Sequence, residues 1–199
     1  MTGFADAPLA MFPLGKPCLP GEVLPLRIFE SRYVTMLRDL LSEPEPQFGV
    51  VLIDRGSEVG GGDVRRNVGT LVSVVRVEEI APEQFAVVTI GTDRLRVVQW
   101  LDDDPYPRAL VETWPTPSSF DESRAESPKG RLERLLDSDV LRHVPSEQRL
   151  FTLATMLPIG ALDLQKLLES GTERDQRTVM IEVLRHLEDL ARFGDPRAD

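Results

Sequence analysis

The segment VLPLRIFESRYVTMLRDLL, residues 23–41, changes its hydrophobic period in the middle. Its first six residues, Val23 to Ile28, predict a strand, and Pro25 confines that strand to a short segment or to a sheet edge because proline cannot donate a ladder hydrogen bond. The residues that follow predict a helix that ends before Pro44 and packs on an apolar surface. The predicted buried face of that helix consists of Phe29, Tyr33, Met36, Leu37, Leu40 and Leu41.

Other strand-like segments lie on both sides of this helix, and turn signals separate them. Their ranges are Leu9 to Leu14, Phe48 to Ile53, Val68 to Val77, Phe85 to Ile90, Leu95 to Leu101 and, as a further candidate, Ala109 to Thr113. No helical pattern interrupts the series after residue 45. This order favours a small, mostly antiparallel barrel or a strongly curved sheet over a doubly wound parallel sheet.

The second half of the chain has the pattern of a small helical bundle. Ser127-Pro128 is typical of a helix N-terminus, and a second helix is expected between residues 146 and 157. Asp163 is expected to cap a third helix, and Thr172-Glu-Arg-Asp175 resembles a capping box at the start of the longest one.

The composition changes between the two halves. Residues 114–128 are rich in proline, serine and acidic residues, which predicts a linker, placed at residues 117–127, with little apolar surface to bury. We therefore expect an α+β protein with a β-barrel subdomain at residues 1–116 and a helical bundle at residues 128–199.

Composition excludes several classes of protein. The chain has 199 residues, one cysteine and a formal net charge of −10. A single cysteine excludes an internal disulfide framework and fits a reducing compartment, and no apolar run approaches the ~20 residues of a membrane span. We expect a cytoplasmic protein. The acidic balance disfavours nonspecific binding of nucleic acids or anionic membranes, because both depend on clustered Lys and Arg.

The sequence contains no recognisable catalytic or metal-binding motif. His143 and His186 lack partners at metal-ligand spacing, and Cys18 lies in a proline-rich loop without a second cysteine. The Asp102–Asp104 run could contact a divalent cation, and Arg65 and Arg66 could hold an anionic group, but both stretches are more typical of solvated turns. We therefore expect no catalytic residues, no metal and no cofactor, and a protein that works by binding.

Several stretches together resemble a known family. They are Phe12-Pro-Leu14, Pro20-Gly21, Leu24-Pro-Leu-Arg-Ile-Phe-Glu-Ser-Arg-Tyr33, Phe48 to Ile53, Glu58-Val-Gly-Gly61, Val68-Gly-Thr70, Gly91 to Val97, Pro105-Tyr106, Ala109 to Glu112 and, in the helical half, Leu162 to Glu169. In order and spacing the chain resembles the N-terminal substrate-recognition domain of Lon proteases over nearly its whole length. The resemblance implies a pseudobarrel related to the PUA fold, followed by a helical bundle.

The resemblance also implies a function. Full Lon proteases continue into an ATPase module with a G-x-x-x-x-G-K-[ST] loop and a protease domain with a Ser and Lys pair, and this chain reaches Asp199 with neither. We expect a free-standing, non-enzymatic module that binds unfolded or extended polypeptide segments, in possible cooperation with a separate protease or chaperone and as a possible homo-oligomer. The alternative is binding of RNA or a modified nucleotide, since PUA-related barrels often bind RNA; the acidic charge makes nucleic acid the weaker prediction.

The signature residues admit two interpretations. In the structural one, Arg27, Glu30 and Arg32 pair with one another or cap the helix start, and Tyr33 packs on the sheet. In the functional one, Arg27, Glu30 and Tyr33 line a peptide-binding cleft together with Glu58 of the glycine-rich loop and Arg94 after Gly91. Both remain open at the level of sequence.

Overall fold

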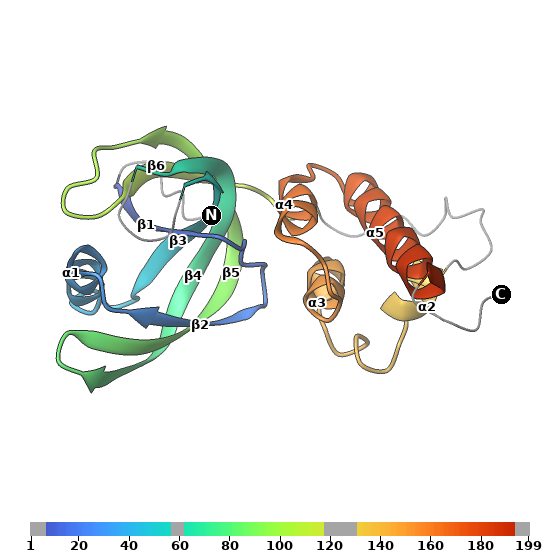
Figure 1. Cartoon of the computed structure of the whole chain (residues 1–199), viewed down its shortest axis with the longest axis horizontal. Helices are drawn as coiled ribbons and strands as arrows, with labels where there is room; N and C mark the ends of the chain where they lie inside the picture. Colours follow the sequence, from blue (N-terminus) through green and yellow to red (C-terminus); the bar gives the residue numbers. More distant parts are fainter. Residues whose placement is uncertain (1–6, 57–61, 118–130, 194–199) are drawn as a thin grey trace. The chain divides into compact units, whose positions relative to one another are not determined.

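The computed structural model describes residues 7–56, 62–117 and 131–193, and the chain divides into two compact units, Met1–Pro115 and Thr116–Asp199 (Figure 1). The predicted linker at residues 117–127 lies, apart from its first residue, outside the described part. None of the described helices is long and apolar enough to cross a membrane.

The first unit is a β-barrel with one additional edge strand. Its strands are β1 (Leu9–Leu14), β2 (Val23–Ile28), β3 (Gln47–Arg55), β4 (Val64–Ala81), β5 (Gln84–Trp100) and β6 (Arg108–Thr113). They are ordered β2-β5-β4-β3-β1-β6, and a further pairing of β6 with β5 closes the ring. β1 and β3 run parallel, whereas the other pairs are antiparallel. The predicted mostly antiparallel barrel is confirmed, and β2 is both short and at the edge, the two options that its proline left open.

β5 is one continuous strand, whereas the sequence predicted two. Its first half, Phe85 to Ile90, pairs with β2, and its second half, Leu95 to Trp100, pairs with β6. Gly91 lies at the junction, where an added Cβ would lie 2.3 Å from the carbonyl oxygen of Leu19. Glycine is therefore required at this position by a close backbone approach inside the strand.

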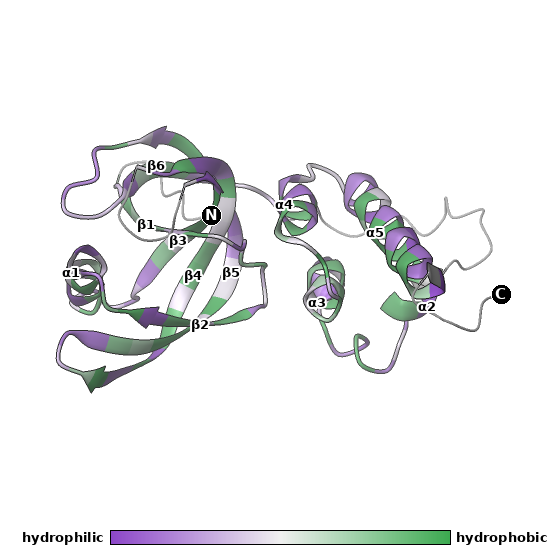
Figure 2. Ribbon diagram, in the orientation of Figure 1, coloured by the Kyte–Doolittle hydropathy of each residue, from purple (hydrophilic) through white to green (hydrophobic). Residues whose placement is uncertain are grey.

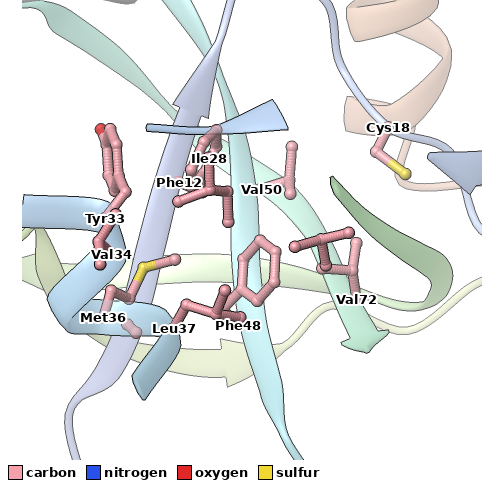
Figure 3. Packing of buried hydrophobic residues seen from close by; sticks show 12 residues of the cluster. Phe12, Cys18, Ile28, Tyr33, Val34, Met36, Leu37, Phe48, Val50 and Val72 are labelled. Carbon is pink, nitrogen blue, oxygen red and sulfur yellow. The ribbon is translucent and has the colours of Figure 1, made fainter. Parts of the chain in front are cut away.

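One end of the barrel is filled by α1 (Ser31–Leu40), which buries four side chains, those of Tyr33, Val34, Met36 and Leu37. They pack with Phe12 of β1 and Phe48 of β3, whose ring centroids lie 5.9 Å apart (Figure 3). Phe29 and Leu41, which were predicted to share the buried face, are 52% and 47% exposed. That prediction was wrong because the helix begins after Phe29 and ends before Leu41, so neither residue keeps the helical phase.

A second core lies on the other face of β1. Successive side chains of a strand point to opposite faces of the sheet. Phe12 therefore belongs to the first core and its neighbour Met11 to the second. Met11 packs with residues of four other strands, namely Val51, Leu71, Leu95, Val97, Ala109 and Val111. The barrel is thus held by two clusters that share β1.

The second unit consists of short helices and one long helix: α2 (Arg131–Leu136), the 3-10 turn η2 (Ser146–Gln148), α3 (Arg149–Thr155), α4 (Ala161–Glu169) and α5 (Glu173–Phe193). Leu164, Leu167 and Leu168 of α4 are buried, as predicted. Polar and apolar residues alternate around α5 with the period of an amphipathic helix (Figure 2). The predicted helical bundle is confirmed.

The caps of these helices differ in part from the prediction. The Thr172 hydroxyl accepts the Asp175 backbone N–H at 3.1 Å, which confirms the cap of α5. Gly160, not Asp163, occupies the N-cap of α4, and Asp163 lies in the first turn, where it pairs with Lys166. The predicted Ser127-Pro128 cap falls outside the described residues.

Candidate functional site

The signature residues Glu30, Arg32 and Tyr33 meet at the start of α1. Glu30 is the N-cap residue by backbone geometry, but its carboxylate makes no cap hydrogen bond and instead pairs with Arg32 at 3.1 Å. The Arg32 guanidinium lies 4.5 Å from the centroid of the Tyr33 ring. The Arg32 guanidinium therefore contacts both the Glu30 carboxylate and the face of the Tyr33 ring.

Tyr33 is a buried core residue. Its side chain is 3% exposed, and its ring centroid lies 4.3 Å from that of Phe12. Burial raises the pKa of Tyr33 to about 12, against the opposing charge of Arg32. These contacts agree with the structural interpretation of the signature, in which Tyr33 packs on the sheet.

A charged network that the sequence did not reveal lies near Tyr33. Arg65 of β4 donates from Nε to Asp63 at 2.6 Å and from Nη1 to Asp103 at 2.9 Å, and its guanidinium lies 4.9 Å from the Trp100 ring. The side chain of Arg65 is only 10% exposed, so the prediction of a solvated turn was wrong for this residue. Asp103 lies 38 positions away in the sequence, and no local pattern signals such a pair.

The Asp63 carboxylate is held in its charged form. Burial by itself would raise its pKa, but the hydrogen bond from Arg65 and the nearby charges of Arg65 and Arg32 outweigh burial and lower the pKa below its usual value. The network therefore fixes the residues that lead into β4 against the turn before β6. This is an arrangement that stabilises the barrel and carries no reactive group.

The five predicted site residues do not form one cluster. Glu30 and Tyr33 lie together, Arg27 is exposed on β2 and bonds to Gln84 Oε1 at 2.7 Å, and Glu58 lies outside the described residues. Arg94 of β5 is 1% exposed and donates to the carbonyl oxygen of Pro115. Burial lowers its pKa to about 10. Arg94 thus fastens the end of the barrel unit and does not line a surface.

An exposed apolar surface lies on the outer side of β2, β5 and β4. Pairing places Val23 opposite Ile90 and Pro25 opposite Val88, and Val75 lies at the bulge of β4 beside them. Val23 and Val75 are each 59% exposed and Ile90 is 37% exposed. We call these five residues the outer apolar surface. Sequence reasoning missed it because its members come from three strands and meet only through register.

The acidic, histidine and cysteine side chains are also possible metal ligands. Groups of three or more His, Cys, Asp or Glu side chains that could hold a metal ion are absent from the residues that the structure describes. Cys18 is buried, and burial together with the charge of Glu22 raises its pKa to about 12, so the thiol is protonated at neutral pH. Asp103 of the acidic run pairs with Arg65.

Comparison with known proteins agrees with this architecture. Residues 8–186 match the family model of the ATP-dependent protease La (LON) substrate-binding domain. The chain belongs to the Lon substrate-binding domain family. It is 28% identical over 118 residues to the Lon protease of Anaeromyxobacter dehalogenans (strain 2CP-C) and 32% identical over 98 residues to Lon protease 2 of Sorangium cellulosum (strain So ce56). These alignments cover 58% and 48% of this chain but only 14% and 12% of the two proteases.

Solved Lon-type domains have the same fold. A Lon N-terminal domain protein from Xanthomonas campestris is 27% identical with a TM-score of 0.67, and the match covers 90% of this chain and 98% of that one. The N-terminal domain of the Mycobacterium avium complex Lon protease has a TM-score of 0.63 at 16% identity and covers 87% and 96%, which shows the fold alone. The pseudobarrel with C-terminal helices implied by the resemblance is confirmed.

Proposed function

We propose that this Lon-type domain is a non-catalytic module that binds extended segments of other polypeptides through the outer apolar surface. The observation that carries the proposal is the meeting of Val23 and Ile90, both exposed, on neighbouring strands at the edge of the sheet. Membership in a substrate-binding family supports a polypeptide as the ligand. Exposed apolar patches of this kind are typical of protein-binding surfaces.

A magnitude limits the affinity of such a surface. Burying roughly 300 Å² of apolar area contributes about 7 kcal/mol, and association costs at least ~4 kcal/mol. The remaining ~3 kcal/mol corresponds to a dissociation constant weaker than millimolar. Useful binding therefore needs either backbone hydrogen bonds, several copies of the domain, or a larger partner such as a protease or chaperone.

The proposal assigns different roles to the residues singled out in the sequence. Arg27 lies on β2 beside the outer apolar surface and belongs to the proposed binding site. Tyr33 and Arg94 hold parts of the barrel unit together, and Glu30 pairs locally with Arg32 at the start of α1. The proposal requires no cofactor, and it assigns the protein to the cytoplasm.

The test replaces the two central apolar side chains without disturbing the strands. Val23→Thr combined with Ile90→Thr keeps β-branched residues at both positions and removes apolar area. The matched control is Val64→Thr combined with Val98→Thr, which changes valines that are 55% and 64% exposed elsewhere on β4 and β5. Binding of a fluorescein-labelled, carboxymethylated and permanently unfolded protein is measured by anisotropy.

We expect the V23T/I90T variant to bind about fivefold or more weakly, and the control to bind like the parent protein. Equal binding by both variants, with unchanged thermal unfolding, would contradict the proposed site. Backbone hydrogen bonds of an extended segment add to the apolar contribution, so the proposed function requires binding at millimolar concentration, and its absence in the parent protein would contradict the function. The same preparation is expected not to hydrolyse ATP or cleave the labelled protein.

A further inference from the structure

The free edge of β2 can be identified from its hydrogen bonds. The Gly91 N–H donates to the Glu22 carbonyl oxygen at 2.9 Å, so the backbone of Glu22 faces β5. Backbone groups alternate between the two sides of a strand, so Leu24, Leu26 and Ile28 also face β5. Val23, Pro25 and Arg27 therefore direct their backbone groups to the other side. Among the described strands, β2 has no partner on that side.

The position of proline agrees with this assignment. Pro25 has no N–H group, and on the β5 side it would remove a ladder hydrogen bond. At the free edge it removes one potential donor and leaves its carbonyl oxygen available. The edge thus offers the N–H and C=O groups of Val23 and Arg27 and the C=O group of Pro25.

The same three residues also carry side chains on the outer face. Val23 and Pro25 are exposed and belong to the outer apolar surface, and Arg27 follows them two positions later on the same face. The Arg27 guanidinium donates to the amide oxygen of Gln84, a neutral partner that leaves its charge uncompensated by that bond. Along its outer face, β2 therefore presents two apolar positions and then a cation.

We propose that an extended polypeptide segment adds as an antiparallel strand to the free edge of β2, with a carboxylate opposite Arg27 and apolar side chains opposite Pro25 and Val23. This inference rests on the proposed function and specifies how the ligand binds. Backbone hydrogen bonds to Val23 and Arg27 supply affinity, and the outer side chains select the pattern acid-x-apolar-x-apolar. The antiparallel direction matches the pairing of β2 with β5 and gives the more stable ladder.

Charge complementarity favours this ligand over a second copy of the chain. In a two-fold pairing of two β2 strands centred on Pro25, Arg27 of each copy would lie opposite Val23 of the other. The cation would then meet an apolar side chain instead of a carboxylate. An acidic, apolar segment of another polypeptide satisfies both the backbone and the charge.

The first experiment tests the backbone pairing. The probe is a fluorescein-labelled peptide of sequence Ser-Glu-Thr-Val-Thr-Val-Ser, with two analogues that differ only in the site of N-methylation. Methylation at Glu and the first Val removes N–H groups that face β2, whereas methylation at the two Thr residues removes N–H groups that face solvent. We expect the first analogue to bind about tenfold or more weakly and the second to bind like the parent peptide. Equal binding by both analogues would overturn strand addition and leave the proposed function intact.

The second experiment tests the register by a charge swap. Arg27→Glu is expected to weaken binding of the parent peptide about tenfold, and replacing the peptide Glu by Lys is expected to restore it. The control is Arg142→Glu in the second unit, which makes the same charge change at an exposed arginine and should leave binding unchanged. Equal loss with both peptides would overturn the register. A protein dimer in analytical ultracentrifugation that Arg27→Glu dissociates would identify a second copy as the occupant and overturn the proposal.

Discussion

At the scale of single residues, the signature side chains at the start of α1 have partners within the barrel unit. Glu30, Arg32 and Tyr33 satisfy one another and the core below them, and Arg65 joins Asp63 to Asp103. Each of these charged side chains contacts a group of opposite charge or the face of an aromatic ring, which restricts its conformation. Arg27 differs from them because its hydrogen-bond partner is a neutral amide.

The Asp63 carboxylate gives a prediction for the dependence of stability on pH. Its pKa is lowered in the folded protein, so its contribution is complete above the pKa of the unfolded chain and is lost as pH falls toward the folded value. We expect Asp63→Asn to reduce the free energy of unfolding at neutral pH by about 1–3 kcal/mol. We expect the difference to shrink as pH falls below about 4, the pKa of an aspartate in the unfolded chain, toward the lower pKa of Asp63 in the folded protein.

Urea unfolding followed by tryptophan fluorescence at several pH values measures this effect. Asp139→Asn is the matched control, because that aspartate is 86% exposed and its ion pair with Arg142 lies on the surface. A loss of stability in the Asp63 variant that persists unchanged to pH 3 would show that the charge of Asp63 is not its cause.

At the scale of elements, the two ends of β5 have different tasks. The half that pairs with β6 closes the barrel, and the half that pairs with β2 carries an edge strand with an open side. Thr89 is buried in the half of β5 that pairs with β2. Its hydroxyl donates to the Leu24 carbonyl oxygen at 3.0 Å and so fixes β2 in register. A fixed edge is suited to strand addition because its backbone groups need no reordering before a ligand binds.

The N-terminus of α5 gives a second prediction. The Thr172 hydroxyl accepts the Asp175 backbone N–H, so Thr172→Ala removes the cap and should lower stability by about 1 kcal/mol. Thr178→Ala is the control, because its hydroxyl bonds only to the Arg174 carbonyl oxygen within the exposed part of the helix. Urea unfolding followed by far-UV circular dichroism reports both variants. Equal effects of the two substitutions would contradict a special role of the cap.

At the scale of the whole molecule, the barrel has its own hydrophobic cores. Both buried clusters of the first unit draw all their members from residues 9–111. The hydrogen bond of Arg94 to Pro115 lies inside the same unit and fastens its last residues to β5. A unit with a complete core is expected to fold by itself.

A fragment of residues 1–117 tests this expectation. Both tryptophans of the chain, Trp100 and Trp114, lie in the fragment, so its emission spectrum can be compared directly with that of the full chain. We expect the same emission maximum and a cooperative unfolding transition. An emission maximum typical of solvent-exposed tryptophan would show that the barrel depends on the helical unit.

The sequence by itself determined the elements whose signal is local. β1 and β2 begin and end where the sequence predicted, and α1 lies within the predicted helix, because periodicity and proline positions act over a few neighbouring residues. The family, too, was evident from the order and spacing of short stretches. The position of the N-cap of α4 did not follow from the sequence. The cap is Gly160, whereas the sequence predicted Asp163, because residues a few positions apart at a helix start can each serve as a cap.

Only the tertiary structure decided which distant residues meet. The continuity of β5 through Gly91, the burial of Arg65 between Asp63 and Asp103, and the row formed by Val23 and Ile90 all depend on strand register. Register is set by the simultaneous packing of several strands around shared cores. The hydrophobic pattern of a single segment does not specify which residues of a distant strand it pairs with. The proposed binding surface is therefore a property of how β2, β4 and β5 pair, although the sequence alone predicted the bounds of β2.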